Sequence, residues 1–170
     1  NFMNILMNMS SRLVIALGIA GCVITAGCDL SAGRMIGFGA CISGMLLQRM
    51  DYSGKFFPDM QPLNVFVVAL IAMLVCAAFG TVTGFFIAYL NVPPFIATLA
   101  MMEIVYGIGL IVTNATPLGG YVEQYTNVSN GKFLGINYLI WIAIIVAAIT
   151  WFIFNMTRHG KYMYAIGGNP

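Results

Sequence analysis

Five long apolar stretches alternate with polar stretches along the chain, and this alternation predicts the elements of the fold. The apolar stretches are continuous, which is typical of helices and not of the alternating segments of about ten residues in a membrane β-barrel. They predict helices at residues 4–26, 33–48, 63–90, 95–112 and 138–155. Polar residues lie between these ranges and also follow the last one, at 156–170. The predicted fold class is therefore all-α.

Composition places these helices in a membrane. Hydrophobic residues make up 61% of the chain and charged residues 7%, whereas ordinary soluble domains carry about 25% charged residues. A soluble domain of this size would not stay dissolved with so few charges. We therefore expect a polytopic bundle of about five transmembrane segments, forming one domain over residues 1–170. The chain starts at Asn1 within an apolar pattern and stops at Pro170, so we expect a longer protein around it.

The polar stretch Gly27–Arg34 interrupts two apolar runs and carries Asp29, Ser31 and Arg34. Non-helical backbone at membrane depth is tolerated only where protein buries it or a water-filled cavity borders it. The stretch is therefore either the pivot of a transport pathway or a turn at the cytosolic surface. Asp29 or Ser31 suits the N-cap of the next helix, because its side-chain oxygen can accept unpaired backbone N–H groups.

The helix expected at 33–48 is short. Its length of about 24 Å is less than the roughly 30 Å hydrocarbon core of a bilayer, which favours a helix that begins inside the membrane. Small residues on one helix face predict close helix contacts, although small residues are also common in membrane helices generally. They are Gly33, Gly37, Ala40 and Gly44 in this helix, and Gly80 and Gly84 in the third.

Two further features mark the fourth helix. The turn Asn91–Pro94 ends the preceding helix, because proline disfavours helix for the residue before it and suits the first turn of the next helix. Glu103 lies near the midpoint of 95–112, where a carboxyl group is costly and must face protein, water or a partner. Glu103 is either a residue of the pathway or a protonated or hydrogen-bonded structural residue.

Charge predicts the orientation. Residues 156–170 contain Arg158 and Lys161 and no acid, whereas 49–62 and 115–137 are each close to balanced. By the positive-inside rule the tail is cytoplasmic, both loops are outside and the 91–94 turn is inside. The break at 27–34 then lies toward the cytoplasmic side or at mid-depth. The net charge of +2 is too small to indicate a nucleic-acid partner.

Catalytic chemistry is not indicated. His159, the only histidine, lies in the tail, and Ser43 lies in an apolar run that holds no histidine to act as its base. The cysteines are interpreted as small buried hydrophobes and not as metal ligands or disulfides: Cys22, Cys28, Cys41 and Cys76. We predict no metal site and no cofactor bound by this chain. A channel or carrier remains, and an ion-coupled carrier of a small polar solute that uses Glu103 is an open alternative.

Three stretches together resemble one family, and their order and spacing match along essentially the whole chain. They are Gly27–Arg34, Ala88–Leu99 and the tail Asn155–Pro170. The chain is similar to the permease subunit of bacterial monosaccharide ABC importers, of the ribose and methyl-galactoside type, and its loop lengths resemble the galactose/methyl-galactoside member most. Glu103 departs from the apolar or small residue expected there.

The resemblance implies a multi-pass permease of the bacterial inner membrane that imports a monosaccharide by alternating access. It further implies a second permease copy, a cytoplasmic ATPase subunit that binds ATP and Mg²⁺, a periplasmic sugar-binding protein and contact with membrane lipid. A preceding helix, a coupling helix and a second set of helices are then expected outside this chain.

The residues expected to serve transport fall into two sets. The candidate pathway residues are Asp29, Ser31, Gly33, Asn91, Pro93, Pro94, Thr98 and Glu103. The residues expected to approach the ATPase are Arg158, Lys161, Gly167, Gly168, Asn169 and Pro170.

Overall fold

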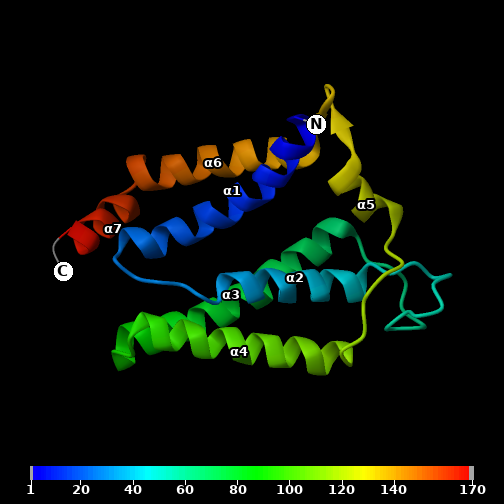
Figure 1. The fold of residues 1–170 in the computed structure, drawn as a ribbon, viewed down its shortest axis with the longest axis horizontal. Helices are drawn as coiled ribbons and strands as arrows, with labels where there is room; N and C mark the ends of the chain where they lie inside the picture. Colours follow the sequence, from blue (N-terminus) through cyan, green and yellow to red (C-terminus); the bar gives the residue numbers. More distant parts are fainter. Residues whose placement is uncertain (1, 169–170) are drawn as a thin grey trace. The chain divides into compact units, whose positions relative to one another are not determined.

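The protein is described by a computed structural model over residues 2–168, in which the chain forms two compact units (Figure 1). Unit 1 combines residues 1–28 with 127–170, and unit 2 is residues 29–126. The sequence pattern predicts one domain over the whole chain, and the two units are described separately below. The first crossing between them falls between Cys28 and Asp29, within the polar break.

The described residues form seven helices and one short hairpin. They are α1 (Phe2–Ile24), α2 (Ala32–Leu46), α3 (Val65–Leu90), α4 (Pro94–Thr113), α5 (Glu123–Asn130), β1 (Lys132–Phe133), β2 (Ile136–Asn137), α6 (Tyr138–Met156) and α7 (Arg158–Gly168). The all-α class is confirmed. Four helices, α1, α3, α4 and α6, are long and apolar enough to cross a membrane, and α2 is the short apolar helix at 15 residues. Each expected helix begins and ends within two residues of the helix found.

Two elements differ from the sequence prediction. The tail contains α7, and the loop after α4 contains α5 and the antiparallel hairpin, in which Lys132 pairs with Asn137. Neither α5 nor α7 has a long apolar run, so the hydropathy pattern does not predict these two helices. For α7 a local signal exists, because the Thr157 hydroxyl accepts a hydrogen bond from the Gly160 amide at 3.3 Å, as a capping residue does.

Asparagine defines four helix ends. The Oδ1 atoms of Asn64 and Asn137 accept hydrogen bonds from Phe66 N and Leu139 N, at 2.9 and 2.8 Å, and so cap α3 and α6. Asn91 and Asn114 end α3 and α4 with φ of 54° and 50°. This left-handed conformation is one that asparagine tolerates better than most residues, and it turns the chain sharply.

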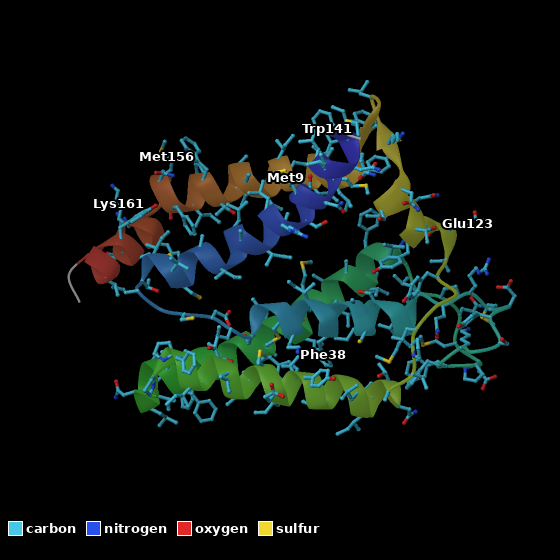
Figure 2. All side chains as sticks on the ribbon, in the orientation of Figure 1. Met9, Phe38, Glu123, Trp141, Met156 and Lys161 are labelled. Carbon is cyan, nitrogen blue, oxygen red and sulfur yellow. The ribbon has the colours of Figure 1, made fainter. Side chains whose placement is uncertain are left out.

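Unit 2 packs α2 against both α3 and α4 through large side chains (Figure 2). Its core consists of Phe38 and Ile42 from α2, Ala72 from α3, and Met101 and Val105 from α4. The rings of Phe38 and Phe79 meet edge to face, with centroids 5.6 Å apart. These contacts hold α2 in place although its 15 residues are fewer than the roughly 20 that span a bilayer.

Unit 1 packs α1 along α6 and α7 with few buried side chains. Among its described residues, the buried ones are Ser10, Asn137, Ala143 and Gly160. A β-carbon at Gly160 would overlap the backbone of Phe154, and one at Gly167 would overlap the carbonyl of Ile24. The helices of unit 1 therefore approach each other closely enough that glycine is required.

Candidate functional site

Helix α2 begins halfway along the two helices it packs against. The Arg34 guanidinium lies 3.9 Å from the centre of the Tyr106 ring, and Phe38 lies beside Gly109. Tyr106 is 12 residues after Pro94, so about 18 Å of α4 precedes the level at which α2 starts. Figure 1 shows α2 beside only the second half of α4.

The register of α2 against α3 also shows that α2 starts about halfway along its neighbour. The Cys76 thiol donates to the Met35 carbonyl at 3.6 Å, and the Leu63 amide donates to the Leu46 carbonyl at 3.4 Å. The two helices are therefore antiparallel, and the 14 residues of α3 after Cys76 continue for about 21 Å beyond the first turn of α2. If α3 and α4 cross the membrane, the polar start of α2 lies near mid-depth and not at the surface.

The break is braced by a local hydrogen-bond pair. Asp29 Oδ1 accepts hydrogen bonds from the Ser31 amide at 2.8 Å and the Ser31 hydroxyl at 2.7 Å. Ser31 occupies the N-cap position and is 5% exposed, but its side chain makes no capping bond to the helix. The prediction that Asp29 or Ser31 is the N-cap is therefore confirmed for Ser31 by position, but the expected capping hydrogen bond from its own side chain to the helix is not formed. Asp29 instead fixes the residue at the cap.

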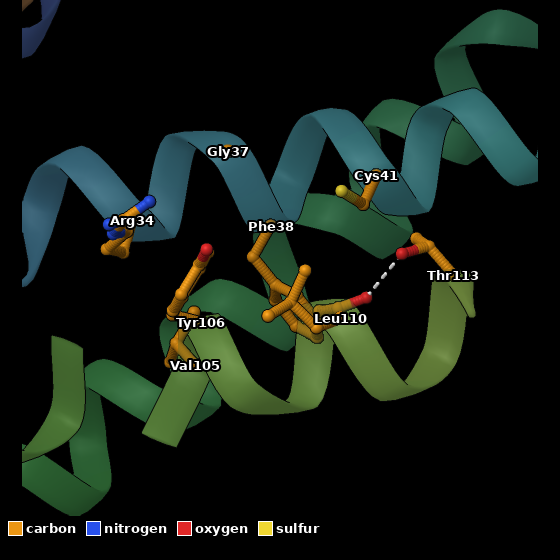
Figure 3. A pocket seen from close by; sticks show the side chains of 9 residues that line it. Arg34, Gly37, Phe38, Cys41, Val105, Tyr106, Leu110 and Thr113 are labelled. Carbon is orange, nitrogen blue, oxygen red and sulfur yellow. Dashed lines mark hydrogen bonds between the residues drawn. The ribbon is translucent and has the colours of Figure 1, made fainter. Parts of the chain in front are cut away.

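A cavity of about 180 Å³ lies between α2 and α4 (Figure 3). Its lining residues are Arg34, Gly37, Phe38, Cys41, Val105, Tyr106, Gly109, Leu110 and Thr113. Arg34 and Tyr106 stand at one end and Cys41 and Thr113 at the other. The Thr113 hydroxyl donates to the Gly109 carbonyl at 2.8 Å, so its proton is used within α4. The cavity is mostly apolar with a few polar groups, as small-molecule sites generally are.

Arg34 is the charged residue of this cavity. Among residues 2–168 the one side-chain ion pair joins Arg49 and Asp51 in an exposed loop, at 3.6 Å, so Arg34 faces the Tyr106 ring and no carboxylate. A cation on an aromatic face gains about 0.5–2 kcal/mol. If α3 and α4 cross the membrane, that is a modest compensation for a charge at mid-depth, where ionisable residues usually serve a pathway or a ligand.

The predicted pathway residues do not form one cluster. Asp29, Ser31 and Gly33 lie at the start of α2, whereas Asn91, Pro93, Pro94 and Thr98 lie at the opposite end of α4 from the cavity. Thr98 is buried and its hydroxyl donates to the Pro94 carbonyl at 2.8 Å. The structure therefore groups the candidates into a break beside the cavity and a separate turn.

Glu103 does not line the cavity. It is exposed on α4, on the face turned away from the buried residues Met101 and Val105. Its side chain points out of unit 2, and its role stays a prediction.

Most of the small-residue stripe of α2 makes no close contact within unit 2. A β-carbon added at Gly33 or Gly37 would meet nothing within 4 Å, and Ala40 is exposed. Gly44 alone is buried, against Leu118 and Tyr121. Helix α2 packs through Phe38 and Ile42 instead. Gly80 and Gly84 of α3 are likewise in open space, so the predicted contact faces remain available to surfaces beyond the described residues.

The two loops expected on the outer side are joined by Gln48, which is 1% exposed at the end of α2. Its Nε2 donates to the Gly119 carbonyl at 3.0 Å, and its Oε1 accepts from the Phe56 amide at 2.7 Å. The amide of Arg49 also donates to the Gly120 carbonyl at 2.7 Å. Sequence reasoning missed this contact, because Gln48 and Gly119 are 71 residues apart.

In unit 1, α7 carries the residues expected to approach an ATPase. Arg158, His159 and Lys161 are exposed, and Gly167 lies against the end of α1. A β-carbon at Gly168 would meet nothing within 4 Å. Asn169 and Pro170 lie outside the described residues. The helix places two cations at its first turn, on a surface that a partner or lipid headgroups can reach.

Comparison with known proteins agrees with the family suggested by the motifs. A family model described as "Branched-chain amino acid transport system / permease component" matches residues 1–170. The galactose/methyl galactoside import permease of Escherichia coli K12 is 43% identical, over 100% of this chain and 53% of its own length. The corresponding permease of Treponema pallidum is 34% identical, over 99% of this chain and 35% of its own length.

A ribose permease also matches. The ribose import permease of Escherichia coli K12 is 31% identical, over 99% of this chain and 50% of its own length. The chain thus spans about half the length of most of these curated relatives. No solved structure matches it. With a match to its model over residues 1–170, the chain belongs to the family described as the permease component of branched-chain amino acid transport systems, and four of its described helices are able to span a membrane.

Proposed function

We propose that this chain is part of the membrane-spanning permease of an ATP-driven importer that carries a monosaccharide such as galactose, a methyl galactoside or ribose. The observation that carries the proposal is the short helix α2, whose polar start lies beside the cavity that it forms with α4, a helix long enough to span the membrane. Broken helices of this kind form substrate sites in transporters. The similarity to galactose and ribose permeases covers essentially all of the chain.

The proposed orientation places α7 in the cytoplasm, at the inner membrane of a bacterial cell. Arg158 and Lys161 then face a cytoplasmic ATPase subunit that binds the ATP and Mg²⁺. The loops joined by Gln48 face the opposite side, where a periplasmic binding protein delivers sugar. A second permease copy and lipid complete the proposed environment, and no nucleic acid takes part. The binding protein supplies specificity, so the permease needs contacts weak enough to release its cargo.

The experiment that tests this proposal measures sugar uptake by the full-length permease in proteoliposomes. Labelled galactose and ribose are supplied with the binding protein, and the ATPase subunit is included or omitted. We expect uptake only with the ATPase, ATP and Mg²⁺, and no loss when a proton or sodium gradient is collapsed. Glu103→Gln should leave this uptake unchanged, because Glu103 lies outside the cavity.

The alternative is an ion-coupled carrier that uses Glu103. It predicts uptake by the permease alone, lost on collapse of the gradient and lost in Glu103→Gln. That pair of results would overturn the importer proposal.

A charge-reversal pair, Arg158→Glu with Lys161→Glu, tests the proposed ATPase face. Weaker co-purification of the ATPase supports this face. Unchanged assembly and topology would make both residues ordinary solvated charges.

A further inference from the structure

We propose that the cavity between α2 and α4 is a weak binding site for the pyranose ring of a sugar in transit. In this site the Tyr106 ring faces the C–H groups of the sugar and the Arg34 guanidinium binds its hydroxyls. This inference rests on the proposed function, since it names residues that would contact the transported monosaccharide.

The size of the cavity suits one sugar ring. It measures about 180 Å³, and an apolar protein cavity of about 150 Å³ is known to hold a benzene molecule. The cavity therefore admits a six-membered ring with its substituents directed toward the open end, and it does not admit a disaccharide without widening.

The lining matches the two kinds of surface on a pyranose. Phe38 and Val105 are buried core residues that give the cavity an apolar floor. Tyr106 presents an exposed ring, and Arg34 holds a planar group with five N–H donors over it. Sugar hydroxyls accept hydrogen bonds from such donors, while the axial C–H groups of the ring pack on an aromatic face. An ion would leave the apolar lining without a contact, and a purely apolar ligand would leave the Arg34 donors without one.

The contact between Arg34 and Tyr106 can be exchanged for contact with a ligand. Both side chains are exposed in this chain, and Arg34 faces no carboxylate among the described residues. A sugar that enters takes the ring face from the guanidinium, and the guanidinium turns its donors to the sugar hydroxyls. Because one protein contact is lost as another forms, the net affinity is low, which suits a site that must release its cargo.

Cys41 provides a direct probe, because it lines the end of the cavity opposite Arg34 (Figure 3). The full-length permease, with its other cysteines replaced, is assembled with the ATPase and labelled by a small thiol reagent. We expect saturating galactose to slow labelling of Cys41 several-fold, and glycerol at the same concentration to leave it unchanged. The matched control is a cysteine at Ile111, which is 77% exposed on α4 and outside the cavity. Equal labelling of Cys41 with and without galactose, or no labelling at all, would contradict the site.

Substitutions separate binding from structural roles. Tyr106→Ala should lower the uptake rate about tenfold, the effect of losing roughly one aromatic contact, whereas Tyr106→Phe keeps the ring and most of the activity. Arg34→Gln should act like Tyr106→Ala, and Arg34→Lys should fall between. Ile111→Ala serves as control. In Tyr106→Ala and Arg34→Gln, galactose should no longer protect Cys41, while the amount of folded protein stays at the wild-type level.

The outcomes distinguish this inference from the proposed function. If the wild-type assembly imports galactose with ATP but the Arg34 and Tyr106 variants import and label as wild type does, the sugar site is wrong and the importer stands. If the wild-type assembly imports no sugar under any of these conditions, the proposed function fails and the sugar site fails with it.

Discussion

Units 1 and 2 hold their helices together by different means. In unit 2, large side chains such as Phe38 and Val105 fill the space between helices and leave a cavity beside them. In unit 1, glycines let α7 approach the ends of α1 and α6 until backbone meets backbone. Side-chain packing tolerates small rearrangements, because rotamers can change, whereas a backbone contact through glycine tolerates almost none. This contrast predicts that substitutions are tolerated better at the helix contacts of unit 2 than at the glycine contacts of unit 1.

The largest effect is expected from Gly167→Ala. The added β-carbon would overlap the Ile24 carbonyl, so α7 has to move away from α1, and overpacking of this kind costs about 1–3 kcal/mol or more. The measurement is the unfolding midpoint of the full-length permease in detergent. Gly18→Ala in α1 is the matched control: its β-carbon meets nothing within 4 Å, and alanine is the better helix former by about 1 kcal/mol. A midpoint that rises equally in both variants would refute the backbone contact.

The next effect concerns the loops of unit 2. Gln48→Leu removes both hydrogen bonds that join Gly119 and Phe56, and it leaves two part-buried backbone groups without these partners, at a cost of about 1–3 kcal/mol. We expect faster hydrogen exchange in residues 49–62 and 118–122 and a lower unfolding midpoint. Gln61→Leu is the control, because Gln61 is exposed. Unchanged exchange in both loops would mean that Gln48 does not join them.

The sequence predicts the unit 2 helices well where local chemistry marks their ends. The Asn91–Pro94 turn and the short α2 follow from proline, glycine and the length of an apolar run. The packing face of α2 does not follow, because small residues at Gly33 and Gly37 and large ones at Phe38 and Ile42 both recur at helical spacing. Only the neighbouring helices decide which face is buried. Helices α3 and α4 contact the face of Phe38 and Ile42 and leave the face of Gly33 and Gly37 open.

The cavity could not be predicted for a related reason. Arg34 and Tyr106 are 72 positions apart, and their meeting depends on the register of α2 against α4. Nothing local to either residue encodes that register. The sequence shows Arg34 at the end of a polar break, which indicates a charge in an unusual place, but it does not show that Tyr106 is its partner. Hydropathy does not predict helices α5 and α7, because both are polar and neither has a long apolar run.

A smaller effect is expected at the start of α2. Asp29→Ala removes the acceptor that holds the Ser31 amide and hydroxyl, and loss of such a local bond costs about 0.5–2 kcal/mol. Since Ser31 sets where α2 begins, we expect lower sugar uptake by the full-length importer and a smaller fall in its unfolding midpoint than Gln48→Leu causes. Asp29→Asn keeps an oxygen at the same place and should retain most of the uptake. Wild-type uptake in Asp29→Ala would show that the break needs no brace.

The smallest effect is a pH dependence at the edge of the unit 2 loops. Burial, with smaller contributions from Tyr125, Cys41 and Tyr52, raises the pKa of Tyr121 above its ordinary value of 10.0. The Tyr121 hydroxyl donates to the Leu118 carbonyl at 2.8 Å, and a phenolate could not. Because the folded protein holds this proton to higher pH than the unfolded chain does, the stabilisation is fully present below pH 10 and is lost as pH rises through the folded-state pKa.

Tyr121→Phe isolates this contribution. The difference in unfolding midpoint between wild type and Tyr121→Phe should be constant up to about pH 9 and shrink above about pH 10. Tyr162→Phe, at an exposed position of unit 1, is the matched control. A difference that stays constant to about pH 11 would place the Tyr121 hydroxyl in water. It would then also argue against the packing of Tyr121 on Gly44 at the end of α2, because that contact contributes to the burial of this side chain.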